Sequence, residues 1–146
     1  MCGKTWYNNA MAKFRYSRLG DSDWYRVVDA KTGEEEYALF SLRDAPKFSK
    51  HMELNITEHS REEIEERRNF SLLLNILEYV FSAVLKITHE LRGVKLCKIY
   101  SNDPMMNMVY RSFADKLGPG YEVKTYRNWI EILKKPGKSK PAGTKK

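Results

Sequence analysis

Cysteine and histidine are scarce in this sequence of 146 residues, and the shortage excludes two kinds of site. Only Cys2 and Cys97 are present, which is too few for a disulfide framework and lacks the spacing of a zinc site. Cys97 lies in "VKLCKIY" and is expected to be a small core residue. The three histidines are scattered without a ligand pattern, so the sequence predicts no metal site.

A signal peptide and a long apolar run are also lacking. The first residues, "MCGKTWYNN", contain no apolar signal-peptide core, so the sequence predicts a cytoplasmic protein. The most apolar stretch, "FSLLLNILEYVFSAVLKI", is short for a bilayer span and carries Asn75 and Glu78. We expect this stretch to be a core helix, and we expect no membrane association.

The positive charge is concentrated at the C-terminus. The formal net charge is +7, yet "KKPGKSKPAGTKK" contains six lysines and no acidic residue, which leaves +1 for the rest of the chain. A segment rich in Pro, Gly and Lys cannot form a core. The sequence therefore predicts a single domain, residues 1–133, followed by a basic flexible tail, residues 134–146. Two roles stay open for the tail: a solubilising end, or an arm that contacts nucleic acid or an acidic surface.

The first third of the chain has the two-residue period of strands. Apolar and polar residues alternate in "AKFRYSR", "DWYRVVD", "EYALFSL" and "HMELNI". The turn "AKTGE" places Gly33 where a positive φ is needed. Because short connections join the four strands, they are expected to form an antiparallel meander.

The period then changes to that of a helix. From Ser60, a candidate N-cap with Glu63 in the capping-box position, apolar residues recur at three- and four-residue steps to about Arg92. Gly93 is expected to end this helix, which is apolar on most sides and is predicted to lie at the centre of the domain. Pro104 begins a second helix that stops at "GPG". Strands are expected at "VKLCKIYSND" before this helix and at "YEVKTYRNWIEIL" after it.

The predicted fold class is α+β. The element order β-β-β-β-α-β-α-β implies a mixed, mostly antiparallel sheet with a long central helix packed on it. The last strand is a candidate edge strand that could pair with a second copy of the chain to form a homo-oligomer.

This order, together with "KIYSND" and "VYRSFADKLGPGYEVKTY", resembles the GNAT superfamily of N-acetyltransferases over about residues 14–133. In that family a strand ends in Asn, the next helix carries a Tyr, and a Gly ends that helix. Here Asn102, Tyr110 and Gly118 take these places in order. The interval from Asn102 to Tyr110 is one residue longer than is usual in the family, which makes Asp103 an alternative to Asn102, and Gly118 comes several positions late.

The resemblance implies transfer of an acetyl group from acetyl-CoA to an amine. It makes Tyr110 the general acid that protonates the coenzyme thiolate and Glu53 a candidate general base. It also places Leu54, Ile56 and Asn102 beside the coenzyme. From the residues alone, Tyr110 could instead be a half-buried core aromatic of an amphipathic helix, and Glu53 could simply face outward from its strand.

The resemblance further implies a phosphate-binding turn, Gln/Arg-x-x-Gly-x-Gly/Ala, at the start of the central helix. Counted from Ile56, Arg61 takes its first position, while Ile64 and Glu66 replace the two glycines that make room for phosphate oxygens. The four glutamates of "REEIEE" would repel a pyrophosphate by about 1 kcal/mol each. Binding of acetyl-CoA is therefore expected to be weak or lost at this turn.

Two features could restore phosphate binding. Arg61, Arg67 and Arg68 could offset the acidic residues, or a longer loop could put "RRNFS" at the true helix start with Asn69 near the phosphates. The simpler alternative is an acidic first turn whose glutamates pair with arginines four residues on, as Glu63 would with Arg67.

Two functions stay open on these grounds. The first is an acetyltransferase of the GNAT type. The second is a non-catalytic relative, either a binding module or a component of a larger assembly, similar to small phage-type acyltransferase-like proteins; in that case the protein could be a virion component. The many Trp and Tyr residues would supply contacts to a protein partner, because these residues dominate interface hot spots.

Overall fold

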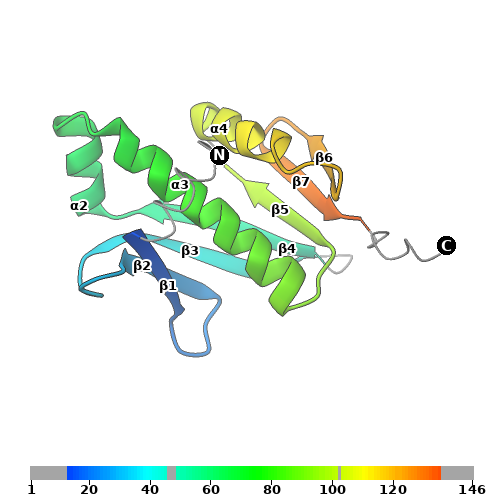
Figure 1. Ribbon diagram of the computed structural model, residues 1–146, viewed down its shortest axis with the longest axis horizontal. Coiled ribbons are helices and arrows are strands. Elements are labelled where there is room, and N and C mark those ends of the chain that lie inside the picture. Colours follow the sequence, from blue (N-terminus) through cyan, green and yellow to red (C-terminus); the bar gives the residue numbers. More distant parts are fainter. Residues whose placement is uncertain (1–12, 46–48, 102, 136–146) are drawn as a thin grey trace. The chain divides into compact units, whose positions relative to one another are not determined.

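The computed structural model describes residues 13–45, 49–101 and 103–135 (Figure 1). These residues form two compact units, which we describe separately. The first unit takes in the described chain up to Arg43 together with Met52–Val84. The second takes in Asp44–His51 and the described chain from Leu85 onward. The single domain 1–133 stays a prediction, and residues 136–146 of the predicted tail lie outside the described residues.

The first unit contains the strands that alternation predicts. In chain order its elements are β1 (Phe14–Arg18), β2 (Trp24–Asp29), β3 (Glu36–Ala45), β4 (Ser49–Ile56), α2 (Glu58–Arg61), the π-helical segment η1 (Glu62–Glu66) and α3 (Phe70–Leu85). The sheet order is β1-β2-β3-β4, and both the β1–β2 and the β2–β3 pairs are antiparallel. Gly33 has φ +71°, as predicted for its turn, and an added Cβ there would lie 2.2 Å from Nη2 of Arg15.

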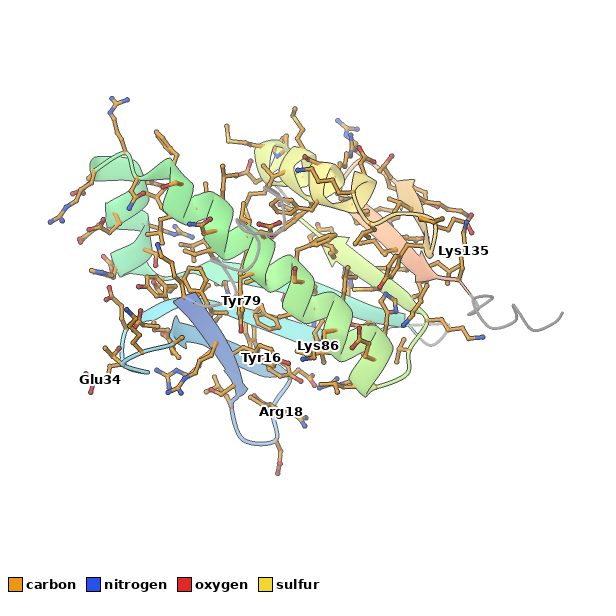
Figure 2. The ribbon with its side chains drawn as sticks, viewed as in Figure 1. Tyr16, Arg18, Glu34, Tyr79, Lys86 and Lys135 are labelled. Carbon is orange, nitrogen blue, oxygen red and sulfur yellow. The ribbon has the colours of Figure 1, made fainter. Side chains whose placement is uncertain are left out.

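Aromatic residues of the strands form the core against α3, which lies across the strands of this unit (Figure 1). Tyr79 of α3 lies 5.5 Å from Phe14 and 6.3 Å from Tyr16, measured between ring centroids, and Figure 2 shows Tyr16 and Tyr79 close together. Tyr25 stacks on Phe40 at 5.1 Å with the rings nearly parallel. Such pairs add about 0.5–1.5 kcal/mol each beyond the area that they bury.

The central helix is confirmed as a core helix, although its start differs from the prediction. Ile76, Leu77, Val80 and Val84 are fully buried, whereas Phe70 at the first turn is 54% exposed. By length and composition the 22 residues 70–91 could cross a membrane, but half of the relevant window is buried inside the protein, as in the core helix of a soluble domain.

The predicted continuous helix from Ser60 to Arg92 is wrong at its N-terminal end. Residues 67–69 separate η1 from α3, and Arg68 has φ +56°. Ile64 is buried, but the positions four and seven residues later are the polar Arg68 and Ser71. A single straight helix therefore has no continuous apolar stripe through this region, and the chain turns between the two segments.

The cap of the first helical segment also differs from the prediction, because it is Thr57 and not Ser60. The Thr57 hydroxyl accepts a hydrogen bond from the Ser60 amide at 3.3 Å and lies 2.9 Å from the Glu36 carbonyl. Replacing Thr57 with alanine is expected to lower the free energy of unfolding by about 1 kcal/mol. Urea unfolding measures this, with Thr57→Ser, which keeps the hydroxyl, as the control. An alanine variant as stable as the parent would show that the cap contributes nothing.

The second unit is built on three strands and the helix α4. In chain order its remaining elements are η2 (Lys86–Leu91), β5 (Leu96–Tyr100), α4 (Pro104–Asp115), β6 (Tyr121–Thr125) and β7 (Trp129–Lys134). The order β5-β7-β6 is antiparallel throughout. Pro104 in the first turn of α4 and Gly93 after η2, with φ +68°, lie where they were predicted.

The predicted single strand over residues 121–133 is wrong. It is a hairpin of β6 and β7, in which the Tyr126 amide donates to the Trp129 carbonyl at 2.8 Å. The turn contains neither Gly nor Pro, so the sequence carries no strong turn signal there. The structure therefore adds a seventh strand to the predicted six while confirming the α+β class and the mostly antiparallel pairing.

Candidate coenzyme site

The start of α3 is the feature of the first unit most suited to an anion. Asn69 precedes the helix, and its Oδ1 accepts hydrogen bonds from the Ser71 hydroxyl at 3.0 Å and from the Leu72 amide at 3.3 Å. A helix start of this length offers backbone N–H groups and the positive end of the helix dipole. The alternative start of the central helix at "RRNFS" is confirmed, although the residues before it form the helical segments α2 and η1 and not a longer loop.

Arg67 and Arg68 lie immediately before this helix start. Arg67 donates to the Glu63 carboxylate at 3.0 Å, which confirms the predicted i,i+4 pair, and its side chain is still 77% exposed. Arg68 is exposed and adopts the left-handed conformation, which costs a non-glycine residue about 1 kcal/mol or more. Residues in such conformations gather at functional sites, where the surrounding structure offsets the strain.

The residues predicted to replace the loop glycines are not at the start of α3. Ile64 is a buried residue of η1, and Glu66 is the last residue of that segment. Arg61 is exposed at the end of α2. The predicted alignment of "REEIEE" with the phosphate-binding turn is therefore one helical segment too early.

Acidic side chains nevertheless surround this corner of the first unit. Glu62, Glu65 and Glu66 are exposed on η1. At the start of α2, an open hollow of about 540 Å³ is lined by Glu34, Glu35, Glu36, Thr57 and His59, with an ion pair between His59 and Glu35. These carboxylates attract cations and weaken anion binding nearby, although exposed charges are partly screened by salt.

The predicted residues of β4 lie beyond the hollow along that strand. Glu53 pairs with Arg43 at 3.6 Å, and its side chain is 44% exposed. Leu54 and Ile56 are half-buried. The accessibility of Glu53 is compatible with a general base, whereas its ion pair with Arg43 occupies part of the carboxylate.

Tyr110 lies on the buried face of α4 in the second unit. It is fully buried, more so than the half-buried aromatic that the sequence suggested. Burial raises the pKa of its phenol above the ordinary value of 10.0. Tyr110 therefore stays neutral at physiological pH and can act as a hydrogen-bond donor. Asn102 lies outside the described residues, and its alternative, Asp103, caps α4 by accepting from the Met105 amide at 2.9 Å.

Sequence reasoning missed two residues of α4 that hold the β6–β7 turn. Nδ2 of Asn107 donates to the Arg127 carbonyl, and Nη2 of Arg111 donates to the Tyr126 carbonyl, each at 2.9 Å. No local signal could have found them, because the hairpin itself was not predicted. Among the described residues, no group of three or more His, Cys, Asp or Glu side chains is arranged to hold a metal ion.

Comparisons with known proteins find relatives by structure and not by sequence. No protein-family model matches the chain, and no curated protein matches its sequence. The N-terminal domain of a ribosomal-protein-alanine acetyltransferase from Clostridium acetobutylicum matches with a TM-score of 0.50 and 10% identity, over 86% of this chain and 92% of that one. The N-acetyltransferase PseH from Campylobacter jejuni matches with a TM-score of 0.48 and 11% identity, over 80% and 71%. PseH in complex with acetyl coenzyme A matches with a TM-score of 0.47 and 10% identity, over 80% and 71%.

Proposed function

We propose that this protein, whose fold is that of the GNAT acyl-CoA N-acyltransferases, binds acetyl-CoA and transfers its acetyl group to an amine. The observation that carries the proposal is the position of the α3 start. The helix begins at Phe70, directly after Arg67, Arg68 and Asn69, and not within the glutamates of η1. A phosphate group bound at this point would lie close to two arginines and to the N-terminus of α3.

Each of these residues has a separate part in holding the coenzyme pyrophosphate. Asn69 orders the first turn of α3 by accepting from the Leu72 amide, which leaves the amides of Phe70 and Ser71 as the proposed phosphate donors. Arg68 supplies charge from a left-handed backbone conformation, which glycine adopts more readily than arginine does. Arg67 shares its charge with Glu63, so it contributes less to an anion than Arg68 does.

The reaction is written with the groups that the fold offers. The amine nitrogen attacks the thioester carbonyl, the C–N bond forms, the C–S bond breaks, and the amine loses a proton while the sulfur gains one. Glu53 is the proposed acceptor of the amine proton, and Tyr110 the proposed donor toward the sulfur. Burial raises the pKa of the Tyr110 phenol, which therefore stays protonated until it gives its proton to the leaving sulfur; the phenolate then regains a proton from water.

Acetyl-CoA is expected to raise the thermal midpoint of the intact protein. A ligand that binds only the folded state stabilises it by about 2.7 kcal/mol at 100 times its dissociation constant. Arg68→Gly keeps the left-handed backbone and removes the charge, so it is expected to need several-fold more acetyl-CoA for the same shift. Arg68→Lys, which keeps the charge, serves as the control.

A flat midpoint at millimolar acetyl-CoA in all three proteins would refute the proposal. That outcome would favour the second candidate, a non-catalytic relative that uses the fold to bind a protein partner. Two observations support this candidate: no glycine occurs between residues 34 and 92, and Tyr110 is fully buried. Pull-down of a stoichiometric protein partner by the same intact chain would then be the next measurement.

A further inference from the structure

Charge divides sharply between the two units. The first unit has 10 Lys and Arg against 13 Asp and Glu, a net charge of −3. The second has 16 Lys and Arg against 6 Asp and Glu, a net charge of +10. The basic character therefore extends beyond the tail to the folded part of the second unit. A unit of this charge attracts a polyanion.

One face of the β5-β7-β6 sheet in this unit carries fully buried apolar side chains, and the other face carries half-buried or exposed ones. Cys97, Ile99, Ile130 and Ile132 are fully buried on the face that α4 covers. Residues of the opposite face alternate with these along the strands and are half-buried or exposed. This opposite face, which we call the aromatic face, carries Lys98, Tyr100, Glu122, Lys124, Trp129 and Glu131.

Flat rings gather at one end of the aromatic face. Tyr126 stacks on Trp129 with centroids 4.7 Å apart and an interplanar angle of 18°. Trp129 lies directly opposite Tyr100 in the strand register, so the two side chains share this face. His51 extends the row, with its ring 5.5 Å from that of Tyr100 and perpendicular to it.

The turn that carries this end of the aromatic face is held rigidly. Its three consecutive carbonyls accept hydrogen bonds: that of Tyr126 from Arg111, that of Arg127 from Asn107, and that of Asn128 from the Ser101 amide. Two of the three donors are side chains of α4, on the far side of the sheet. These hydrogen bonds fix the turn. Tyr126 is therefore held against Trp129 before any ligand binds.

Basic residues flank the rings on both sides. Arg127 lies in the turn and Lys124 on β6, both exposed. Lys98 of β5 pairs with Glu131 at 4.0 Å, and the same carboxylate accepts a hydrogen bond from Nε1 of Trp129 at 3.1 Å, so Lys98 contributes less to phosphate binding. At the opposite end of the strands Lys134 and Lys135 are exposed, and Figure 2 shows Lys135 at the end of β7. Four further lysines follow in residues 136–146.

We propose that the aromatic face binds single-stranded nucleic acid. Bases stack on Tyr126, Trp129 and Tyr100, because every base offers a π-face to an aromatic ring. The lysines of the second unit and of the tail neutralise the phosphates. A duplex keeps its bases stacked on one another, so the rings favour a single strand. This site is independent of acetyl-CoA binding at α3.

Tryptophan fluorescence of the intact protein tests the proposal directly. Single strands of 12 nucleotides, oligo(U) and oligo(dT), are expected to quench the emission, and a 12-base-pair duplex to bind more weakly. The quenching is expected to disappear in Trp129→Phe and to persist in Trp24→Phe, whose residue lies in the first unit. Comparison of the two oligonucleotides tells RNA from DNA.

Two further variants separate stacking from charge. Tyr126→Ala is expected to weaken binding by about 5- to 100-fold without changing its salt dependence. Deletion of residues 136–146 is expected to reduce the slope of log affinity against log salt by about 1–3. Met108→Ala, at an exposed residue of α4, is the matched control and should change neither.

Three results would overturn the proposal: absence of any quenching, quenching that survives in Trp129→Phe, or equal affinity for duplex and single strand. A Tyr126→Ala protein that folds and binds like the parent would also overturn it, since binding would then reside in the tail alone. Thermal unfolding of each variant shows whether it is folded.

Discussion

Replacing Tyr110 with alanine is expected to lower the free energy of unfolding by about 3–5 kcal/mol, the usual cost of removing a buried aromatic ring. Tyr110 is the largest of the fully buried side chains. Its removal leaves a cavity that α4 and the sheet of the second unit can only partly close. Because a domain of this size has only about 5–15 kcal/mol of stability, the variant is expected to be partly unfolded at 37 °C. Urea unfolding at 25 °C measures the loss.

Tyr110→Phe separates the structural role of this residue from a catalytic one. The phenylalanine ring fills nearly the same volume, so the loss of stability is expected to be much smaller than for alanine. If Tyr110 donates a proton or a hydrogen bond to the leaving sulfur, acetyl transfer should fall by about 10²–10⁴-fold in the same variant. Unchanged transfer in Tyr110→Phe would show that the residue is only part of the core. An alanine variant as stable as the parent would contradict its burial.

The sequence predicts those elements whose signals are local. Alternation places the first strands, Gly33 marks the turn between β2 and β3, and Pro104 marks the first turn of α4. At the two marked positions the residue type meets a direct physical requirement. Glycine tolerates the positive φ of the turn, and proline lacks an N–H that the first turn of a helix leaves unpaired. The element order that follows from these signals is enough to indicate the GNAT fold.

One feature escaped sequence analysis because distant residues impose it, and a second was open only as one of two alternatives. The turn after β6 has no Gly or Pro and is held by Asn107 and Arg111, 20 and 15 residues away from the carbonyls that they bind. The break before α3 occurs at Arg68, in a run of good helix formers, and only Asn69 hints at a cap. Local propensity is a weak prior that tertiary contacts override in both places.

The features of the candidate site likewise fall into those that the sequence predicts and those that it does not. The sequence locates Tyr110 on a helix and the arginines near a helix start, because the residue types and spacings are visible. The sequence does not show that Tyr110 is fully buried. It also does not show that Ile64 is buried in the core and that α3 begins six residues after it, at Phe70. Both depend on which apolar residues share a face in three dimensions.

Alkaline pH is expected to destabilise the protein through buried groups that are neutral when protonated. Burial raises the pKa of the Cys97 thiol from 9.0 to about 12 and that of the Tyr79 phenol from 10.0 to about 12. A hydrogen bond from Thr88 partly offsets the effect on Cys97, as one with the Tyr16 backbone does on Tyr79. Each group ionises more readily in the unfolded chain, so each favours unfolding once the pH exceeds its unfolded pKa.

The direction and the pH range follow from these values. The contribution of Cys97 is fully present below pH 9 and is lost as the pH rises toward 12, and that of Tyr79 is lost between pH 10 and 12. By linkage the two together are expected to lower the free energy of unfolding by about 3 kcal/mol at pH 10.5. Urea unfolding between pH 7 and pH 11 measures the profile. A free energy of unfolding that stays constant to pH 11 would contradict the burial of both groups.

Two variants assign the loss to its sources, one in each unit. Cys97→Ala should retain more stability than the parent between pH 9 and pH 10.5, relative to its own value at pH 7, because no thiol remains to ionise. Tyr79→Phe should reduce the loss only above pH 10. Since Tyr79 lies in the first unit and Cys97 in the second, the part of the tyrosinate absorbance that is lost in Tyr79→Phe and the part of the thiol reactivity that is lost in Cys97→Ala report on the two units separately. Coincident transitions by both probes would support the single cooperative domain that the sequence predicts, whereas separate transitions would mean that the two units unfold independently.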